Sequence, residues 1–175
     1  MKSRAILYTT AILTVLSVGC AKQPAKSPTT PTKIVQDVEK GVIVTADTFG
    51  EAISSTGKGI VSLTNDLTID KDLVVNGEFK NDKNNIERKI YLYDQEKDKS
   101  ATAKFALTVP KLTINSPNTS IEHGTIIGDI YVSSNNFQLI DTTVDGNIYF
   151  TNDEAKATFK MDDISKVTGN QELKK

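Results

Sequence analysis

The residues that could carry acid–base chemistry are few in this chain. His123 is the single histidine among 175 residues, and Asp141 follows it 18 positions later. A histidine beside a carboxylate is a pairing that acid–base catalysis uses. A histidine at a turn before Gly124 is also an ordinary surface residue, and we expect this second role for His123.

The donor set for a transition-metal site is incomplete. One cysteine and one histidine are present, whereas structural and catalytic sites usually need three or four such ligands. We therefore predict no metal cofactor. The alternative is calcium held at a loop edge by a group of aspartates: Asp141, Asp145, Asp162 and Asp163. We expect these four to be solvated corner residues.

Tyrosines are the stronger candidates for ligand binding. Four of them alternate with apolar residues in short runs: Tyr91, Tyr93, Tyr131 and Tyr149. If Ile130 and Val132 point inward, the residue between them points outward, because side chains alternate along a strand. Stacked outward tyrosines could form a flat platform for a sugar ring, a peptide or another protein. Alternatively, they only stabilise a parallel sheet by aromatic pairing.

An 18-residue repeat supplies the elements that position these side chains. When the sequence is aligned with itself after a shift of 18 residues, residues 112–114 align with 130–132, and these align with 148–150. The same shift aligns Gly128 with Gly146. Such a period, with short apolar–polar–apolar strands, is typical of a solenoid. Steps of six residues lack the small apolar corners of a left-handed β-helix, and parallel crossovers are right-handed. We therefore predict an all-β fold, a short right-handed parallel β-helix of about five coils.

The segments outside the repeat predict a cap and two loops. Residues 47–54 read as a short helix that covers the amino-terminal end of the solenoid, with Thr48 and Glu51 spaced as a capping box. Residues 78–104 break the period, so we expect two projecting loops there, with Arg88 outside the regular coils. Residues 151–156 read as an insertion, and residues 170–175 as a tail too short and polar to cap the other end.

The amino-terminal residues predict export and anchoring. Residues 1–19 combine a basic start with an apolar run, as in a signal peptide, and Gly19 precedes the lone Cys20. This boundary resembles the lipobox of bacterial lipoproteins, although Ser17 stands where a branched apolar residue is commoner. The resemblance implies a lipid thioether on Cys20 that holds the protein at the membrane. Residues 20–33, rich in Pro, Thr and Lys, predict an extended tether before a domain at 34–175.

Charge narrows the partners of this predicted domain. Residues 34–175 contain 16 basic and 22 acidic residues, a net charge of −6. An acidic surface repels polyanions, so we expect no nucleic-acid partner.

The pattern of a cap helix followed by strands at 61–63 and 67–69 resembles pectin-lyase-like right-handed β-helices. It also resembles small β-helix surface lipoproteins of low-GC Gram-positive bacteria, a family with no assigned activity. Enzymes of the pectin-lyase-like fold use clustered acids, whereas Lys111 and Asn147 take the place of Asp129 in the neighbouring coils. The resemblance therefore implies a fold without an enzyme activity.

We expect a lipoprotein anchored outside the cytoplasm that presents a non-catalytic β-helix as a binding, adhesion or cell-envelope module. Its partner would be a cell-wall glycan or a surface protein. One alternative is a divergent polysaccharide lyase or hydrolase. Another is end-to-end self-association, because coils such as residues 128–130 resemble those of the polymer-forming bactofilins.

Overall fold

A computed structural model describes residues 41–95 and 101–174 of the chain. The predicted signal peptide, Cys20, the tether and part of the second polar loop, residues 96–100, lie outside the described residues. No helix in the described part is long and apolar enough to cross a membrane.

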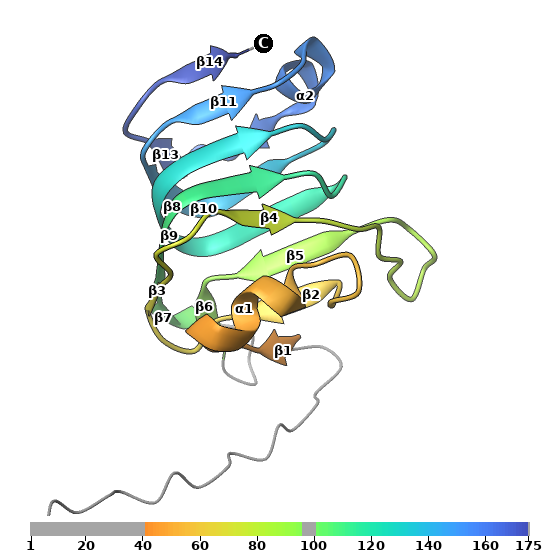
Figure 1. Cartoon of the computed structure of the whole chain (residues 1–175), viewed down its shortest axis with the longest axis vertical. Helices are drawn as coiled ribbons and strands as arrows, with labels where there is room; N and C mark the ends of the chain where they lie inside the picture. Colours follow the sequence, from red (N-terminus) through yellow and green to blue (C-terminus); the bar gives the residue numbers. More distant parts are fainter. Residues whose placement is uncertain (1–40, 96–100, 175) are drawn as a thin grey trace, which may run out of the picture. The chain divides into compact units, whose positions relative to one another are not determined.

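The described residues are mostly β-structure, in which a 12-stranded sheet is built by parallel pairing (Figure 1). The twelve strands are β1 (Val42–Ile43), β2 (Ile60–Ser62), β3 (Leu67–Thr68), β4 (Leu73–Val75), β5 (Arg88–Tyr91), β8 (Ala106–Ile114), β9 (Thr119–Val132), β10 (Gln138–Asp145), β11 (Ile148–Phe150), β12 (Lys160–Met161), β13 (Lys166–Val167) and β14 (Gln171–Leu173). A separate antiparallel pair is formed by β6 (Tyr93–Gln95) and β7 (Ala101–Lys104).

The pairing arranges the parallel strands of the described residues in three columns. The first column contains β1, β2, β5, the starts of β9 and β10, and β12. The second contains β3, the start of β8, the middle of β9, the end of β10, and β13. The third contains β4, the ends of β8 and β9, β11, and β14. Long strands therefore turn corners and serve more than one column, which gives a solenoid-like sheet.

The register confirms the 18-residue repeat. Leu112 pairs with Ile130, and Ile130 pairs with Ile148. These three side chains are fully buried and form one inward row. Burial of each apolar side chain of this size contributes roughly 1.5–3 kcal/mol, so a repeated inward row holds one coil against the next.

Glycines at one corner let successive coils approach closely. Gly128 has φ of 134° and Gly146 has φ of 159°. A Cβ at Gly128 would collide with the carbonyl of Val109, and a Cβ at Gly146 with that of Gly128. The corner between the second and third columns therefore requires glycine in two consecutive coils.

The predicted cap helix is present, but it begins earlier than expected. Helix α1 spans Ala46–Ala52, and its N-cap is Thr45. The backbone N–H of Thr45 donates to Thr48 Oγ1 at 3.0 Å, so Thr48 closes the capping box rather than opening it. Phe49 is fully buried in the core, as is Ile53 after the helix. Figure 1 shows α1 at the β1–β2 end of the coiled sheet.

The expectation that Arg88 lies outside the regular coils is wrong. Arg88 begins β5, pairs with Thr119 and is fully buried. Its guanidinium donates to the carbonyls of Ala52 (2.8 Å), Ser54 (3.4 Å) and Asn76. Burial lowers the pKa of Arg88 to about 10, which leaves the side chain charged at neutral pH. Arg88 therefore joins the end of α1 to the end of β4.

The carboxy-terminal residues form one more coil. Helix α2 (Asp153–Thr158) overlaps the predicted insertion, and β12, β13 and β14 follow it. Within residues 170–175, which the sequence predicts to be too short and polar to cap this end, β14 pairs in parallel with β11 and extends the last coil. In the part of the chain that the structure describes, no strand pairs with the far edge of this coil. Met161 is 39% and Ile164 is 61% exposed there.

Candidate functional site

The four predicted tyrosines fall into two separate groups. Tyr131 and Tyr149 pair with each other in the third column. Tyr91 lies in β5 of the first column, and Tyr93 begins β6. The structure therefore brings the tyrosines together two by two, in different surroundings.

Tyr131 and Tyr149 stack on the outer surface of the third column. Their ring centroids are 4.9 Å apart with an interplanar angle of 43°. This distance follows from the spacing of neighbouring strands, about 4.8 Å. Both side chains are partly exposed, and Thr113 continues the row on the next strand. We call this pair of rings the tyrosine platform.

Two lysines lie over the tyrosine platform. Lys174 Nζ lies 4.4 Å from the centroid of Tyr149, and it donates to the hydroxyl of Tyr131 at 3.4 Å. Lys111 Nζ lies 5.5 Å from the centroid of Tyr131 and forms a 2.7 Å ion pair with Asp72. A cation over a ring face is attracted by the ring quadrupole. The hydrogen bond that Lys174 donates to Tyr131 raises the pKa of Lys174, and the hydrogen bond to Asp72 raises that of Lys111.

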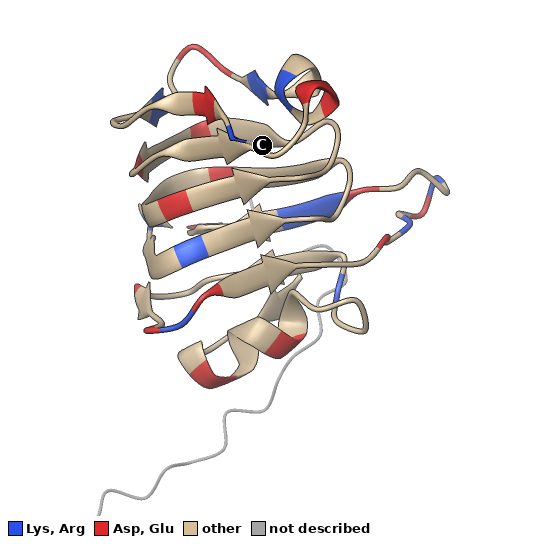
Figure 2. Ribbon diagram, turned by 45° about the horizontal axis from the view of Figure 1, so that its top comes forward, with Lys and Arg blue, Asp and Glu red and all other residues tan. Residues whose placement is uncertain are grey.

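A polar ladder runs beside the tyrosine platform. Asp129 pairs in register with Lys111, as predicted, and its carboxylate accepts from both the backbone N–H and the side-chain amide of Asn147 at 2.9 Å. The side-chain carbonyl of Asn147 accepts in turn from the backbone N–H of Asn170 at 2.9 Å. Basic and acidic segments follow one another on β8 and β9 of this face in Figure 2. The face is therefore polar and of mixed charge, with an aromatic centre.

The second group is built around His123. Its Nδ1 lies 2.9 Å from Asp141 Oδ2, and Lys104 Nζ lies 2.6 Å from the same oxygen. The His–Asp pair that the sequence left open is therefore formed. The ring of Tyr93 meets His123 edge to face at 4.6 Å, and Tyr91 lies 5.3 Å from Tyr93.

Tyr93 does not have the open position that the alternation predicted. Its side chain is only 8% exposed, so it cannot serve as a flat platform for a ligand. Burial and the nearby charge of Glu122 raise the pKa of both Tyr91 and Tyr93. These two tyrosines therefore remain protonated and belong to the packing around His123.

The backbone at the His123 cluster is unusual. His123 has φ of 60° and Asp141 has φ of 47°, a region that side-chain-bearing residues seldom occupy. The hydrogen bond from Lys104, followed by that from His123, lowers the pKa of Asp141. Asp141 also donates its backbone N–H to Asp162 at 2.9 Å. These contacts tie three successive coils together at one corner.

The His123 cluster contains parts of an acid–base centre and does not line either of the two pockets that follow. A pocket of about 490 Å³ is lined by Glu78, Asn115, Pro117, Ser133, Ser134, Asn135, Asn152 and Glu154. Another borders Phe79, and His123 lines neither of them. Arg88, the basic residue that a lyase-like reaction would need, is buried among backbone carbonyls.

No group of three or more His, Cys, Asp and Glu side chains among the described residues is arranged to hold a metal ion. The carboxylates of Asp141 and Asp162, two of the calcium candidates, already accept hydrogen bonds from Lys104 and Ser165.

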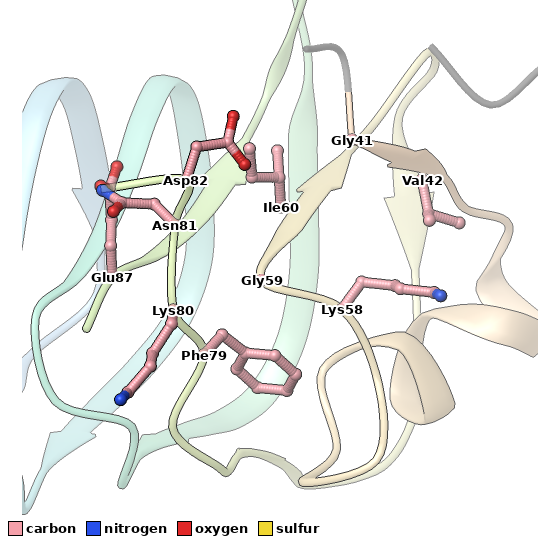
Figure 3. Close-up of a pocket in the computed structure, with 10 residues that line it drawn as sticks. All are labelled: Gly41, Val42, Lys58, Gly59, Ile60, Phe79, Lys80, Asn81, Asp82 and Glu87. Carbon is pink, nitrogen blue, oxygen red and sulfur yellow. The ribbon is translucent and has the colours of Figure 1, made fainter. Parts of the chain in front are cut away.

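Sequence reasoning missed the pocket of about 370 Å³ beside Phe79, shown in Figure 3. Ile60 and Phe79 give it apolar walls, and its charged lining residues are Lys58, Lys80, Asp82 and Glu87. One signal was available in the sequence. Phe79 is an isolated aromatic residue between Gly77 and a polar run, a position where an aromatic ring needs a local packing partner.

No family model, curated protein or solved structure matches this chain. The resemblances to lipoproteins and to pectin-lyase-like proteins therefore remain predictions from the residues.

Proposed function

We propose that this protein is a lipid-anchored module outside the cytoplasm that binds a cell-wall glycan or a surface protein through the tyrosine platform. Its domain is a right-handed parallel β-helix. Three columns of parallel strands and a register of 18 residues support this assignment. Anchoring is supported by the apolar run before Cys20 and by the proline-containing tether after it.

The observation that carries the binding proposal is the stack of Tyr131 and Tyr149. The rings repeat at strand spacing on an outer face, 4.9 Å apart, and neither belongs to the buried core. Tyrosine combines a large apolar surface with a polar hydroxyl and loses little conformational entropy on binding. Such rings are therefore common anchors in binding surfaces.

The surroundings of the rings favour a partner with hydroxyl or amide groups. Lys174 and the Asp129–Asn147–Asn170 ladder offer donors and acceptors around the aromatic centre. Because this face carries charges of both signs, it does not attract a partner whose charges are all of one sign. A glycan or a polar protein surface meets both conditions, because each offers apolar patches and hydrogen-bonding groups together.

The test compares a double substitution on the platform with a matched one on the second column. Tyr131→Ala with Tyr149→Ala should weaken retention of the full-length protein on isolated cell walls at least about tenfold, since interface tyrosines often contribute over 1 kcal/mol each. Thr125→Ala with Ile127→Ala should leave retention unchanged. Equal retention of all three proteins would show that the platform is not the binding surface.

Detergent phase separation and metabolic labelling test the lipid anchor. Cys20→Ser should prevent acylation, so the protein should no longer behave as a lipid-modified species in detergent phase separation. Metabolic labelling with a fatty acid should mark the wild type and not the variant. Labelling of the variant would overturn the assignment of Cys20 as the lipidated residue.

One observation favours end-to-end association as a second candidate function. Strands β12, β13 and β14 have no partner on their far edges among the described residues, and free strand edges can pair with another chain. Lys160 and Lys166 on these strands oppose such pairing, because charged edge residues discourage it. Sedimentation that stays monomeric at rising concentration would exclude this candidate.

A further inference from the structure

The pocket beside Phe79 is a second candidate binding site, and it lies at the end of the domain where the described chain begins. Its volume is about 370 Å³, and its lining includes Gly41 and Val42 as well as Ile60. Figure 3 shows the ring of Phe79 beside Gly59, with Lys58 and Lys80 on either side of it. The pocket is thus an apolar hollow whose lining also contains two lysines and two acids, Asp82 and Glu87.

The aromatic wall of this pocket is held in place. The guanidinium carbon of Arg88 lies 4.4 Å from the centroid of Phe79. Gly59 and Gly77 make room for the ring, because a Cβ at Gly59 would lie 3.1 Å from Phe79 Cβ and one at Gly77 would lie 3.0 Å from Phe79 Cε2. Arg88 is itself fixed by backbone carbonyls. A preformed apolar wall of this kind favours an occupant that brings apolar side chains.

We propose that this pocket is the seat of residues 34–40 of this same chain. Gly41 lines the pocket, and Lys40 directly precedes Gly41 in the chain, so the segment ends at the edge of the pocket. Val38 is three residues from Gly41, a distance of about 10–11 Å at most in an extended chain. The effective concentration of this segment at the pocket is therefore high, because the chain itself delivers it.

The residues of this segment match the chemistry of the pocket. Ile34, Val35 and Val38 are apolar and follow directly after the proline-containing tether. Asp37 and Glu39 flank Val38, so in an extended chain both point to the face opposite Val38. Val38 can then contact Phe79 while the two acids face solvent.

One feature of the described residues lacks a partner that this segment would supply. Within the described part of the chain, strand β1 pairs with β2 alone, and its Ile43 is 51% exposed. A docked segment would cover this end of the solenoid beside α1, and it would reduce the free tether to residues 21–33. The inference does not depend on the tyrosine platform.

Disulfide trapping in the full chain tests the proposal. Both variants carry Cys20→Ser and Val38→Cys. In the test variant the second cysteine is beside the pocket, as Asp82→Cys. In the control variant it is on the distant α2, as Lys156→Cys. A disulfide forms readily only when the two Cα atoms approach within about 7 Å. We expect the pocket pair to form an intrachain disulfide at least about tenfold faster than the control pair.

Hydrogen exchange provides a second readout without new cysteines. Amides of residues 34–40 should exchange at least about tenfold more slowly than those of residues 21–33, and Phe79→Ala should remove this difference. Equal trapping rates for the two cysteine pairs together with equal exchange in the two segments would overturn the proposal. Predominantly interchain disulfides would also overturn it and would assign the pocket to a second copy of the chain.

Discussion

The two ends of the coiled sheet are finished in different ways. At the amino-terminal end, α1 buries Phe49 completely, and Arg88 links the end of that helix to β4. At the carboxy-terminal end, Val167 and Leu173 are only partly buried, and Ile164 is 61% exposed. The sheet is therefore capped at one end and open at the other.

This difference indicates where the stability of the domain is concentrated. In a solenoid each coil contacts only its neighbours, so a terminal coil has half the contacts of an internal one unless a cap replaces the missing neighbour. The capped end recovers those contacts through an aromatic residue and a buried cation. The open end holds its last coil by short strands and by a hydrogen-bonded turn at Asp162 and Ser165.

The largest expected contrast between the ends comes from truncating one apolar residue at each. Phe49→Ala should lower the free energy of unfolding by about 3–5 kcal/mol, because it leaves a cavity under α1. Leu173→Ala should lower it by only about 1 kcal/mol, since water already reaches that side chain. Urea unfolding of the two variants measures both values. Equal losses would mean that the open end is covered by something the contacts do not show.

Arg88 gives the second test of the capped end. Arg88→Lys keeps a cation but replaces a planar donor with a single ammonium, which cannot serve the separate carbonyls of Ala52, Ser54 and Asn76 together. The free energy of unfolding should fall by about 2 kcal/mol, the cost of leaving a buried carbonyl without its donor. The neighbouring Lys89→Arg, on a partly exposed side chain, is the control and should change stability by less than about 0.5 kcal/mol.

Low pH should destabilise the last coil at the open end, and we expect this effect to be smaller than those of the Phe49 and Arg88 substitutions. The hydrogen bond from Ser165 lowers the pKa of Asp162 below its usual value of 3.8. Because the folded pKa is the lower one, the stabilisation is present above pH 3.8 and is lost as the pH falls through the folded value. Amides of β12 and β13 should then exchange faster below that pH, after correction for intrinsic rates, while those of β2 should not.

The same measurement on Asp162→Asn shows whether the carboxylate is responsible. The variant should show the faster exchange at neutral pH already, and it should lose the dependence on acid. If β12 and β13 in the variant still respond to acid as in the wild type, another carboxylate holds the last coil.

The regular part of the fold was predictable because its information is local. Strand β4 and the paired residues Leu112, Ile130 and Ile148 follow directly from alternation and from the 18-residue period. The stack of Tyr131 and Tyr149 follows from the same register. Where every coil has the same length, a position in one coil predicts the neighbour in the next.

The irregular parts depend on contacts between distant segments. The burial of Arg88 requires carbonyls from residues 52, 54 and 76, which no pattern around position 88 announces. Tyr93 alternates like an exposed residue but is covered because His123 and Tyr91 pack against it. Strand β14 has a polar sequence and gains its structure from the edge of β11. Each of these outcomes was decided by a partner outside the local sequence.

The shortness of β1 has a mechanical consequence. In the proposed lipoprotein, a pull on the domain from its anchor would first release residues 34–40 from the pocket proposed above and would then load the β1–β2 pairing. That pairing consists of Val42 with Val61 and Ile43 with Ser62, so only a few hydrogen bonds resist peeling. The next element, α1, is fastened by Arg88 through Ala52 and Ser54. Under load, the first strand would yield before the helix, which adds length to the tether while the coils that carry the tyrosine platform stay folded.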